Sequence, residues 1–257
     1  MKRFLVPLFA LASLALVVAT PFVSAQAADA PSFEKRDWAF DGIFGTFDRA
    51  TLQRGFQVYR EVCSACHGLK FVYFRNLSAL GYDEETIKAL AAEYEVTDGP
   101  DEAGAMFQRP ARPSDRFVSP FPNDNAARAA NNGAFPPDLS LMTKARKGGP
   151  DYLYALLTGY TDEPEELEMM EAMYYNTVFP GHQIAMPPPI VEDGVEYADG
   201  TPATPEQITS DVVTFLSWAA EPEMVERKRL GLKVMLFLII FTGLLAAVKR
   251  KVWSDLH

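Results

Sequence analysis

The chain has 257 residues, of which 48% are hydrophobic, and its formal net charge is −10 at pH 7. This length suits one or two domains with a packed core. Residues 1–25 hold two basic residues, and residues 227–257 hold seven basic residues and one acid. The region between them therefore keeps 15 basic and 33 acidic residues, a net charge of −18. A field of that sign repels nucleic acid and attracts basic partners, so we expect no nucleic-acid binding.

Residues 1–25 have the pattern of a secretory signal peptide. Lys2 and Arg3 precede an apolar stretch from Phe4 to Val18, and small residues then offer cleavage sites after Ala25 or Ala27. An uncleaved membrane helix is the alternative, but the apolar stretch is short for a bilayer span. We therefore predict that residues 1–25 are removed and that residues 26–226 form a domain outside the cytoplasm.

A helix predicted over residues 49–62 leads into the motif Cys63-Ser64-Ala65-Cys66-His67. Two thiols at this spacing, followed by histidine, are typical of covalent attachment of one haem c. Each thiol bonds one vinyl group of the porphyrin, and His67 would be an axial ligand of the iron. Redox disulfides and zinc sites also use Cys-x-x-Cys. A redox pair leaves His67 unexplained, and a zinc site lacks ligands, because no other cysteine exists and the remaining histidines are distant.

The middle of the chain is predicted as helices joined by loops, without strands. Helices are expected over residues 83–94, 125–131 and 151–159, and another, capped by Asp138 or Ser140, through Lys147. Residues 99–122 are rich in Pro, Gly and Arg, which indicates a loop. Residues 134–139 are expected to form an extended turn, because a proline disfavours helix in the residue before it.

The iron needs a second axial ligand or an open face. Met186 lies between prolines in a stretch that cannot continue a helix, so it belongs to a stiff loop that can hold a thioether. His182, in the same loop, is the alternative ligand. Met169, Met170 and Met173 have helical spacing and are interpreted as packing residues. With histidine and methionine as ligands, the iron has no place for a substrate, which favours electron transfer.

The C-terminal region carries a membrane anchor. Thr204-Pro205-Glu206-Gln207 has the pattern of a helix start. Residues 230–248 are apolar apart from Lys233, Thr242 and the glycines, and that length spans a bilayer. Basic residues follow at 249–251, as expected for a cytoplasmic end. We predict a transmembrane anchor and short tail over 227–257, although the basic residues at 227–229 weaken the charge asymmetry, and a buried core helix is the alternative.

The chain resembles the cytochrome c1 family of bacterial type, the haem subunit of the cytochrome bc1 complex. The resemblance covers nearly the whole mature chain. It is carried by four stretches: 58–67, Ala126-Ala127-Arg128-Ala129-Ala130-Asn131-Asn132-Gly133-Ala134-Phe135-Pro136-Pro137-Asp138-Leu139-Ser140, 156–160 and the Met186 loop. The resemblance implies a mainly α cytochrome c-type haem domain with extended loops, plus one C-terminal transmembrane helix.

The resemblance also implies the site. Cys63 and Cys66 carry the thioethers, and His67 and Met186 bind the iron. Arg146 faces a propionate, which suits a carboxylate that needs a charged partner. The residues that line the haem by similarity are Asn131, Ala134, Pro137, Arg146, Tyr152, Leu156, Leu157, Phe179 and Pro189. One departure is His182, which stands in the axial loop, where the family requires no histidine.

The family relays one electron from the Rieske iron–sulfur protein to a cytochrome c, in a membrane complex with cytochrome b. We therefore expect a subunit of a quinol–cytochrome c reductase that spans the bacterial inner membrane once. Its haem domain would be periplasmic and its C-terminus cytoplasmic. The acidic domain suits a basic cytochrome c as acceptor. A free-standing, membrane-anchored cytochrome c that serves an oxidase is the first alternative. A haem sensor or peroxidase with an open iron site is the second.

Overall fold

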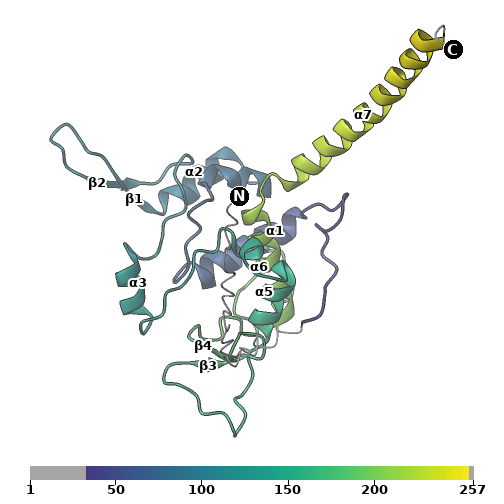
Figure 1. The fold of residues 1–257 in the computed structure, drawn as a ribbon. Coiled ribbons are helices and arrows are strands. Elements are labelled where there is room, and N and C mark those ends of the chain that lie inside the picture. The colour runs from purple at the N-terminus through teal and green to yellow at the C-terminus, as the bar shows by residue number, and fades with distance from the viewer. Residues whose placement is uncertain (1–32, 255–257) are drawn as a thin grey trace, which may run out of the picture. The chain divides into compact units, whose positions relative to one another are not determined.

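The computed structural model describes residues 33–254. The predicted signal peptide and His257 lie outside the described residues. The fold is mainly helical with one long C-terminal helix, which confirms the expected class (Figure 1). The helices are α1 (Arg49–Val58), α2 (Glu84–Ala92), α3 (Asp124–Ala130), α4 (Met142–Ala145), α5 (Gly149–Thr158), α6 (Pro205–Ala220) and α7 (Met224–Trp253), with a π-helical turn at Tyr59–Cys63 and a 3₁₀ helix at Phe74–Leu80.

Two short antiparallel ladders correct the expectation that the chain has no strands. β1 (Glu95–Asp98) pairs with β2 (Phe107–Pro110), which lies inside the expected loop, and β3 (Tyr174–Tyr175) pairs with β4 (Gln183–Ile184). Strands of two to four residues with largely exposed side chains carry no periodic signal that sequence reasoning can detect.

One expected helix and one interpretation of packing residues are also corrected. The helix expected to run through Lys147 is only the four residues of α4, and its start has no side-chain cap. Asp138 and Ser140 bond the chain near His67 instead. The three methionines at 169–173 lie outside any helix, and Met170 is 58% exposed, so they are not a packed helical face.

α6 forms the centre of the core. All of its residues from Asp211 to Ala219 are buried, and α1, α4 and α5 pack against it. α1 crosses α6 at Gly55, where a Cβ would lie 2.7 Å from the Cβ of Phe215 and would collide with the Asp211 carbonyl. Arg54 Nε also donates to the buried Asp211 Oδ2 at 2.8 Å. This close crossing fixes the end of α1, where the cysteine motif begins.

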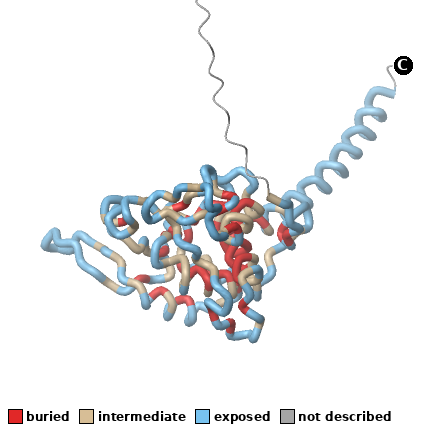
Figure 2. The backbone as a smooth tube through the Cα atoms, turned by 90° about the horizontal axis from the view of Figure 1, so that it is seen from below, coloured by how far each residue is buried: buried red, intermediate tan, exposed pale blue. Residues whose placement is uncertain are grey.

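α7 has the properties of a membrane anchor. Its 30 residues correspond to about 45 Å of helix. Its most apolar stretch has a mean hydropathy of 2.3 and no buried residue. The predicted span 230–248 lies inside α7. Figure 2 shows the buried segments gathered in the domain, while α7 is exposed from Arg229 onward. Within residues 33–254, α7 is the one helix long and apolar enough to cross a membrane.

Candidate functional site

The cysteine motif lies at the end of α1. The helix widens into the π-helical turn Tyr59–Cys63, and the chain then turns so that His67 N–H donates to the Cys63 carbonyl at 2.9 Å. Cys63 is half-buried against the core and Cys66 is exposed, and both are free thiols. Burial raises the pKa of the Cys63 thiol to about 12. Reactive redox cysteines have lowered pKa values, so the environment of Cys63 is not that of a reactive redox thiol.

The His67 ring is oriented by the Pro137 carbonyl. Its Nδ1 lies 2.7 Å from Pro137 O. Because a carbonyl oxygen only accepts, Nδ1 carries the hydrogen and the lone pair is on Nε2. Burial lowers the pKa of His67, which keeps the ring neutral at pH 7. A neutral imidazole with one nitrogen anchored and the other carrying its lone pair is suited to bind a metal.

The residues that follow Pro137 are hydrogen-bonded to the residues that follow His67. Leu139 N–H donates to the Gly68 carbonyl at 2.9 Å, and Asp138 Oδ2 accepts from Lys70 N–H at 2.8 Å. The fully buried Ser140 hydroxyl accepts from the next amide of that chain at 3.0 Å. Two stretches about 70 residues apart are therefore joined into one unit.

The other predicted lining residues from this segment lie just before that junction. Ala134 N–H donates to the Asn131 carbonyl at 2.9 Å, and the Asn131 side chain closes the end of α3 on Ala127 at 2.7 Å. Gly133 has a φ of 86°, which a residue with a side chain rarely adopts, so this turn requires glycine. Asn131 and Ala134 are thus brought near Pro137 by a fixed turn.

α5 supplies the next group of predicted lining residues. Tyr152 is buried in the core, while Leu156 and Leu157 are half-buried and pack against it. Burial raises the pKa of Tyr152, and the positive charge of Arg146 acts in the opposite direction. Arg146 is exposed and lies within electrostatic reach of Tyr152. α5 therefore presents a partly open apolar face beside one guanidinium.

Asn176 connects α5 to the Met186 loop. It is fully buried, and its Nδ2 donates to the Leu156 carbonyl at 2.8 Å. Its Oδ1 accepts from the amides of Val178 and Phe179, each at 3.0 Å. Its own amide donates to the His182 carbonyl at 2.9 Å and extends the β3–β4 ladder. One amide side chain therefore holds the helix and the loop together.

Met186 follows β4 by two residues and is half-buried. The Tyr160 hydroxyl donates to its carbonyl at 3.0 Å, and burial raises the pKa of Tyr160, which keeps that hydroxyl protonated. Pro189 is half-buried beside Ile190, which packs against the core. His182 is exposed, and its Nδ1 lies 3.1 Å from the Asn176 carbonyl.

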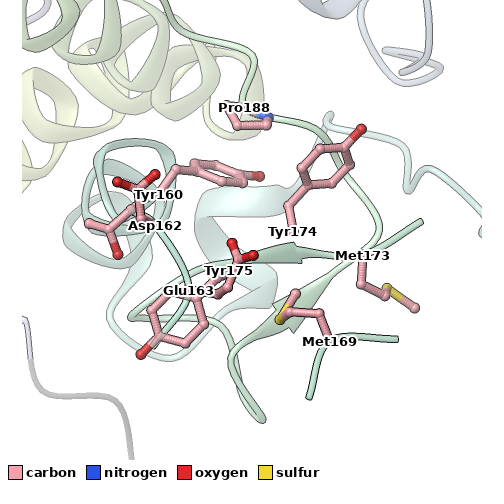
Figure 3. A pocket seen from close by; sticks show the side chains of 9 residues that line it. Tyr160, Asp162, Glu163, Met169, Met173, Tyr174, Tyr175 and Pro188 are labelled. Carbon is pink, nitrogen blue, oxygen red and sulfur yellow. The ribbon is translucent and has the colours of Figure 1, made fainter. Parts of the chain in front are cut away.

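Tyr160 and Pro188 form part of the wall of a cavity of about 270 Å³ (Figure 3). Its wall includes Met169 and Met173, and also Asp162 and Glu163. None of the cysteine motif residues lines it. None of the predicted ligand or haem-lining residues lies in its wall, so this cavity is not the candidate haem site.

The donor groups fit a covalently bound haem. Two free thiols and a neutral, oriented imidazole occupy one segment, and a thioether occupies a loop tied to α5. Half-buried Leu156, Leu157 and Phe179 supply apolar surface. Among residues 33–254, no group of three or more His, Cys, Asp or Glu side chains could hold a metal ion. The zinc alternative therefore has no ligand set in that part of the chain.

Comparison with known proteins gives the family. The sequence model described as the Cytochrome C1 family matches residues 38–256. The chain belongs to the cytochrome c1 family. The sequence is 55% identical over 240 residues to cytochrome c1 of Rhodospirillum rubrum, an alignment that covers 87% of this chain and 88% of that protein. It is 51% identical over 220 residues to a mitochondrial cytochrome c1 heme protein of Arabidopsis thaliana, covering 85% of this chain and 71% of that protein.

A third relative is the cytochrome b/c1 protein of Bradyrhizobium diazoefficiens. It is 48% identical over 273 residues, and the alignment covers 95% of this chain but only 40% of that longer protein. Cytochrome c1 is the haem subunit of the bc1 complex, and the family implies electron transport, haem and a transmembrane anchor. The resemblance seen in the sequence is therefore confirmed.

Sequence reasoning missed three features of this candidate site. Pro137 was predicted as a lining residue, but its carbonyl also orients His67. Tyr160 lies in a stretch typical of the family without a predicted role, and it bonds the Met186 carbonyl. Asn176 carried no signal, because a single asparagine among tyrosines and threonine is unremarkable until its burial is known.

Proposed function

We propose that this chain is the electron-transfer subunit of a bacterial bc1 complex. It accepts single electrons from the Rieske iron–sulfur protein and passes them to a basic cytochrome c. Cys63 and Cys66 hold one haem c through thioethers, and His67 and Met186 are its axial ligands. A haem bound there supplies an iron that gains and loses one electron. The observation that carries the proposal is the 2.7 Å contact between His67 Nδ1 and Pro137 O, which leaves Nε2 for the metal.

The residues around the site keep its chemistry limited to electron transfer. Filling both axial positions with side chains leaves no coordination place for oxygen or a substrate. Tyr160 and the Asn176 connections hold the Met186 loop, so the weak thioether ligand does not have to order the loop by itself. Arg146 is proposed to pair with a propionate, because its charge lies at the open edge near Tyr152.

The acidic surface supports a basic electron acceptor. Six of the ten residues from Asp162 to Glu171 are acidic, and all six are exposed. Opposite charge steers association at low salt. This loop follows Tyr160, which bonds the Met186 carbonyl, so the charges lie close in sequence to a residue that contacts the proposed axial loop.

The orientation in the membrane follows from the charges at the ends of α7. Lys249, Arg250 and Lys251 are exposed at its C-terminal end, which the positive-inside rule assigns to the cytoplasm. On the domain side, Arg227 bonds Glu221 and Lys228 bonds two carbonyls. These cations serve contacts within the domain, which accounts for basic residues on a periplasmic flank. We propose a periplasmic haem domain in the bacterial inner membrane.

A subunit list and a spectrum test the function together. We expect the purified membrane complex to contain a cytochrome b and a Rieske protein, and the mass of this chain to include one haem. The oxidised chain should show a weak long-wavelength charge-transfer band that Met186→Leu abolishes, while the exposed Met170→Leu retains it. A chain of unmodified mass would refute the haem assignment. Isolation as a lone haem protein in mild detergent would favour the free-standing shuttle, and ready carbon monoxide binding by the native reduced protein would favour the sensor.

A further inference from the structure

The segment Phe40–Phe47 is a closed loop with an apolar tip. Ile43 and Phe44 are 75% and 77% exposed. The loop is nevertheless well held, because Thr46 N–H donates to the Ala39 carbonyl at 3.1 Å and the rings of its two terminal phenylalanines lie 5.1 Å apart. Two large apolar side chains on a fixed loop indicate a contact surface.

Lys228 ties this loop to α7. Its ammonium donates to the Phe40 carbonyl at 2.7 Å and to the Gly45 carbonyl at 3.2 Å, on either side of the apolar tip. The Lys228 side chain is half-buried in this arrangement. Lys228 precedes Leu230, the first residue of the apolar stretch, by two positions, which is about 3 Å along the helix axis. The base of the loop is therefore held next to the point where the apolar stretch of α7 begins.

That level corresponds to the headgroup region of a bilayer. A bilayer is about 40–45 Å thick with its polar regions and about 30 Å thick in its hydrocarbon core, so each polar region is about 5–8 Å deep. The backbone of Lys228, about 3 Å along the helix axis from Leu230, lies within that depth, and the loop is bonded to its side chain.

We propose that Ile43 and Phe44 insert into the outer polar region of the bilayer beside α7. The loop would then be a second, shallow membrane contact that limits rotation of the domain about its anchor. The bilayer is the expected occupant because the loop is bonded to the membrane helix itself and an aromatic and an aliphatic side chain suit the interface. The inference depends on α7 crossing the membrane, and it is independent of the electron donor and acceptor.

A spin label measures the depth of the tip. Phe44→Cys is labelled in the full haem-loaded chain in lipid nanodiscs, where Cys63 and Cys66 are protected as thioethers. Collision rates with oxygen and with a water-soluble nickel chelate are then compared. Met106→Cys, in the loop after β1, is the water reference, and Phe237→Cys, in α7, is the bilayer reference; the native side chains are 60% and 62% exposed. We expect the oxygen-to-nickel ratio at 44 to be several-fold above that at 106. Equal ratios at 44 and 106 would overturn the proposal.

A second variant tests the tie to α7. Lys228→Met keeps an unbranched side chain but removes the donors, so the ratio at 44 should fall toward that at 106. Arg229→Met is the matched control, since Arg229 has only a 3.7 Å ion pair within its own helix, and it should leave the ratio unchanged. An unchanged ratio in Lys228→Met would contradict the tie. Protection of the label from both reagents in the purified complex would show that another subunit covers the loop, which also overturns the proposal. A low ratio at 237 would show that α7 is not in the bilayer.

Discussion

Replacing Asn176 by aspartate is expected to release the Met186 loop. The change keeps the oxygen that accepts from Val178 and Phe179. It replaces the donor that faces the Leu156 carbonyl at 2.8 Å by a second acceptor. Two oxygens would then face each other in a site with no solvent exposure, where neither finds water.

The size of the effect follows from burial. Leaving one buried carbonyl unpaired costs about 1–3 kcal/mol, and an unpaired buried carboxylate costs more, so we expect a loss of roughly 3 kcal/mol in unfolding free energy at pH 7. Protonation restores a donor to Leu156. The carboxyl pKa is therefore raised in the folded state, and the lost stability should return as the pH falls below that raised value. This pH dependence of stability is opposite in sign to that of a carboxylate whose pKa is lowered on folding.

The assay compares two matched variants of the haem-loaded chain in detergent. Asn123→Asp is the control, because Asn123 is an exposed helix cap whose oxygen accepts from Ala126 N–H at 2.9 Å and aspartate keeps that bond. Chemical unfolding across pH gives the stability, and carbon monoxide binding to the reduced protein reports loss of the axial methionine. If Asn176→Asp matches Asn123→Asp in both measurements, Asn176 does not hold the loop.

Three further predictions concern the core, the junction with α7 and the acceptor surface. Gly55→Ala should lower the unfolding free energy by about 1–2 kcal/mol, since overpacking against α6 outweighs the gain in helix propensity; thermal unfolding beside Gly231→Ala, which has open space, checks this. Hydrogen bonds from Arg227 and Lys144 lower the pKa of Glu221 to about 2 from 4.5. The stability that Glu221 contributes is therefore fully present above pH 4.5 and is lost as the pH falls toward 2, so the unfolding free energy of Glu221→Gln should fall less than that of the native protein over this pH range. Electron transfer to a basic cytochrome c should slow once the screening length falls below about 10 Å, near 0.1 M salt, and neutralising the acids at 165–168 should flatten that dependence in stopped-flow measurements; a flat response in the native protein would contradict steering.

The elements that depend on local chemistry were predictable from the sequence. The start of α6 is an example, because Thr204 accepts from Gln207 N–H and Pro205 begins the helix, as the order of these residues indicated. The span 230–248 lies inside α7 because an apolar run of that length has few other stable arrangements in a protein of this kind. The haem motif was recognisable because thiol spacing is set by covalent chemistry along a few consecutive residues.

The short strands and the weak caps were not predictable. β3 and β4 have two residues each, and Asn176, which directly follows β3, donates to the Leu156 carbonyl 20 residues away, so a tertiary contact fixes this ladder. The helix expected from Asp138 through Lys147 does not form over that range. Asp138 and Ser140 accept hydrogen bonds from the amides of residues 70 and 71 and therefore do not cap a helix. Local propensity was overridden wherever a tertiary partner offered the same hydrogen bonds.

The sequence alone determined the ligand types, the covalent motif and the anchor, because each depends on residues that are neighbours along the chain. Only the tertiary structure decided that the Pro137 carbonyl orients His67 and that Asn176 and Tyr160 hold the Met186 loop. The two halves of each contact are separated by 20 to 70 residues. Their meeting depends on how α1, α5 and α6 pack, and packing is a property of the whole core rather than of any one stretch.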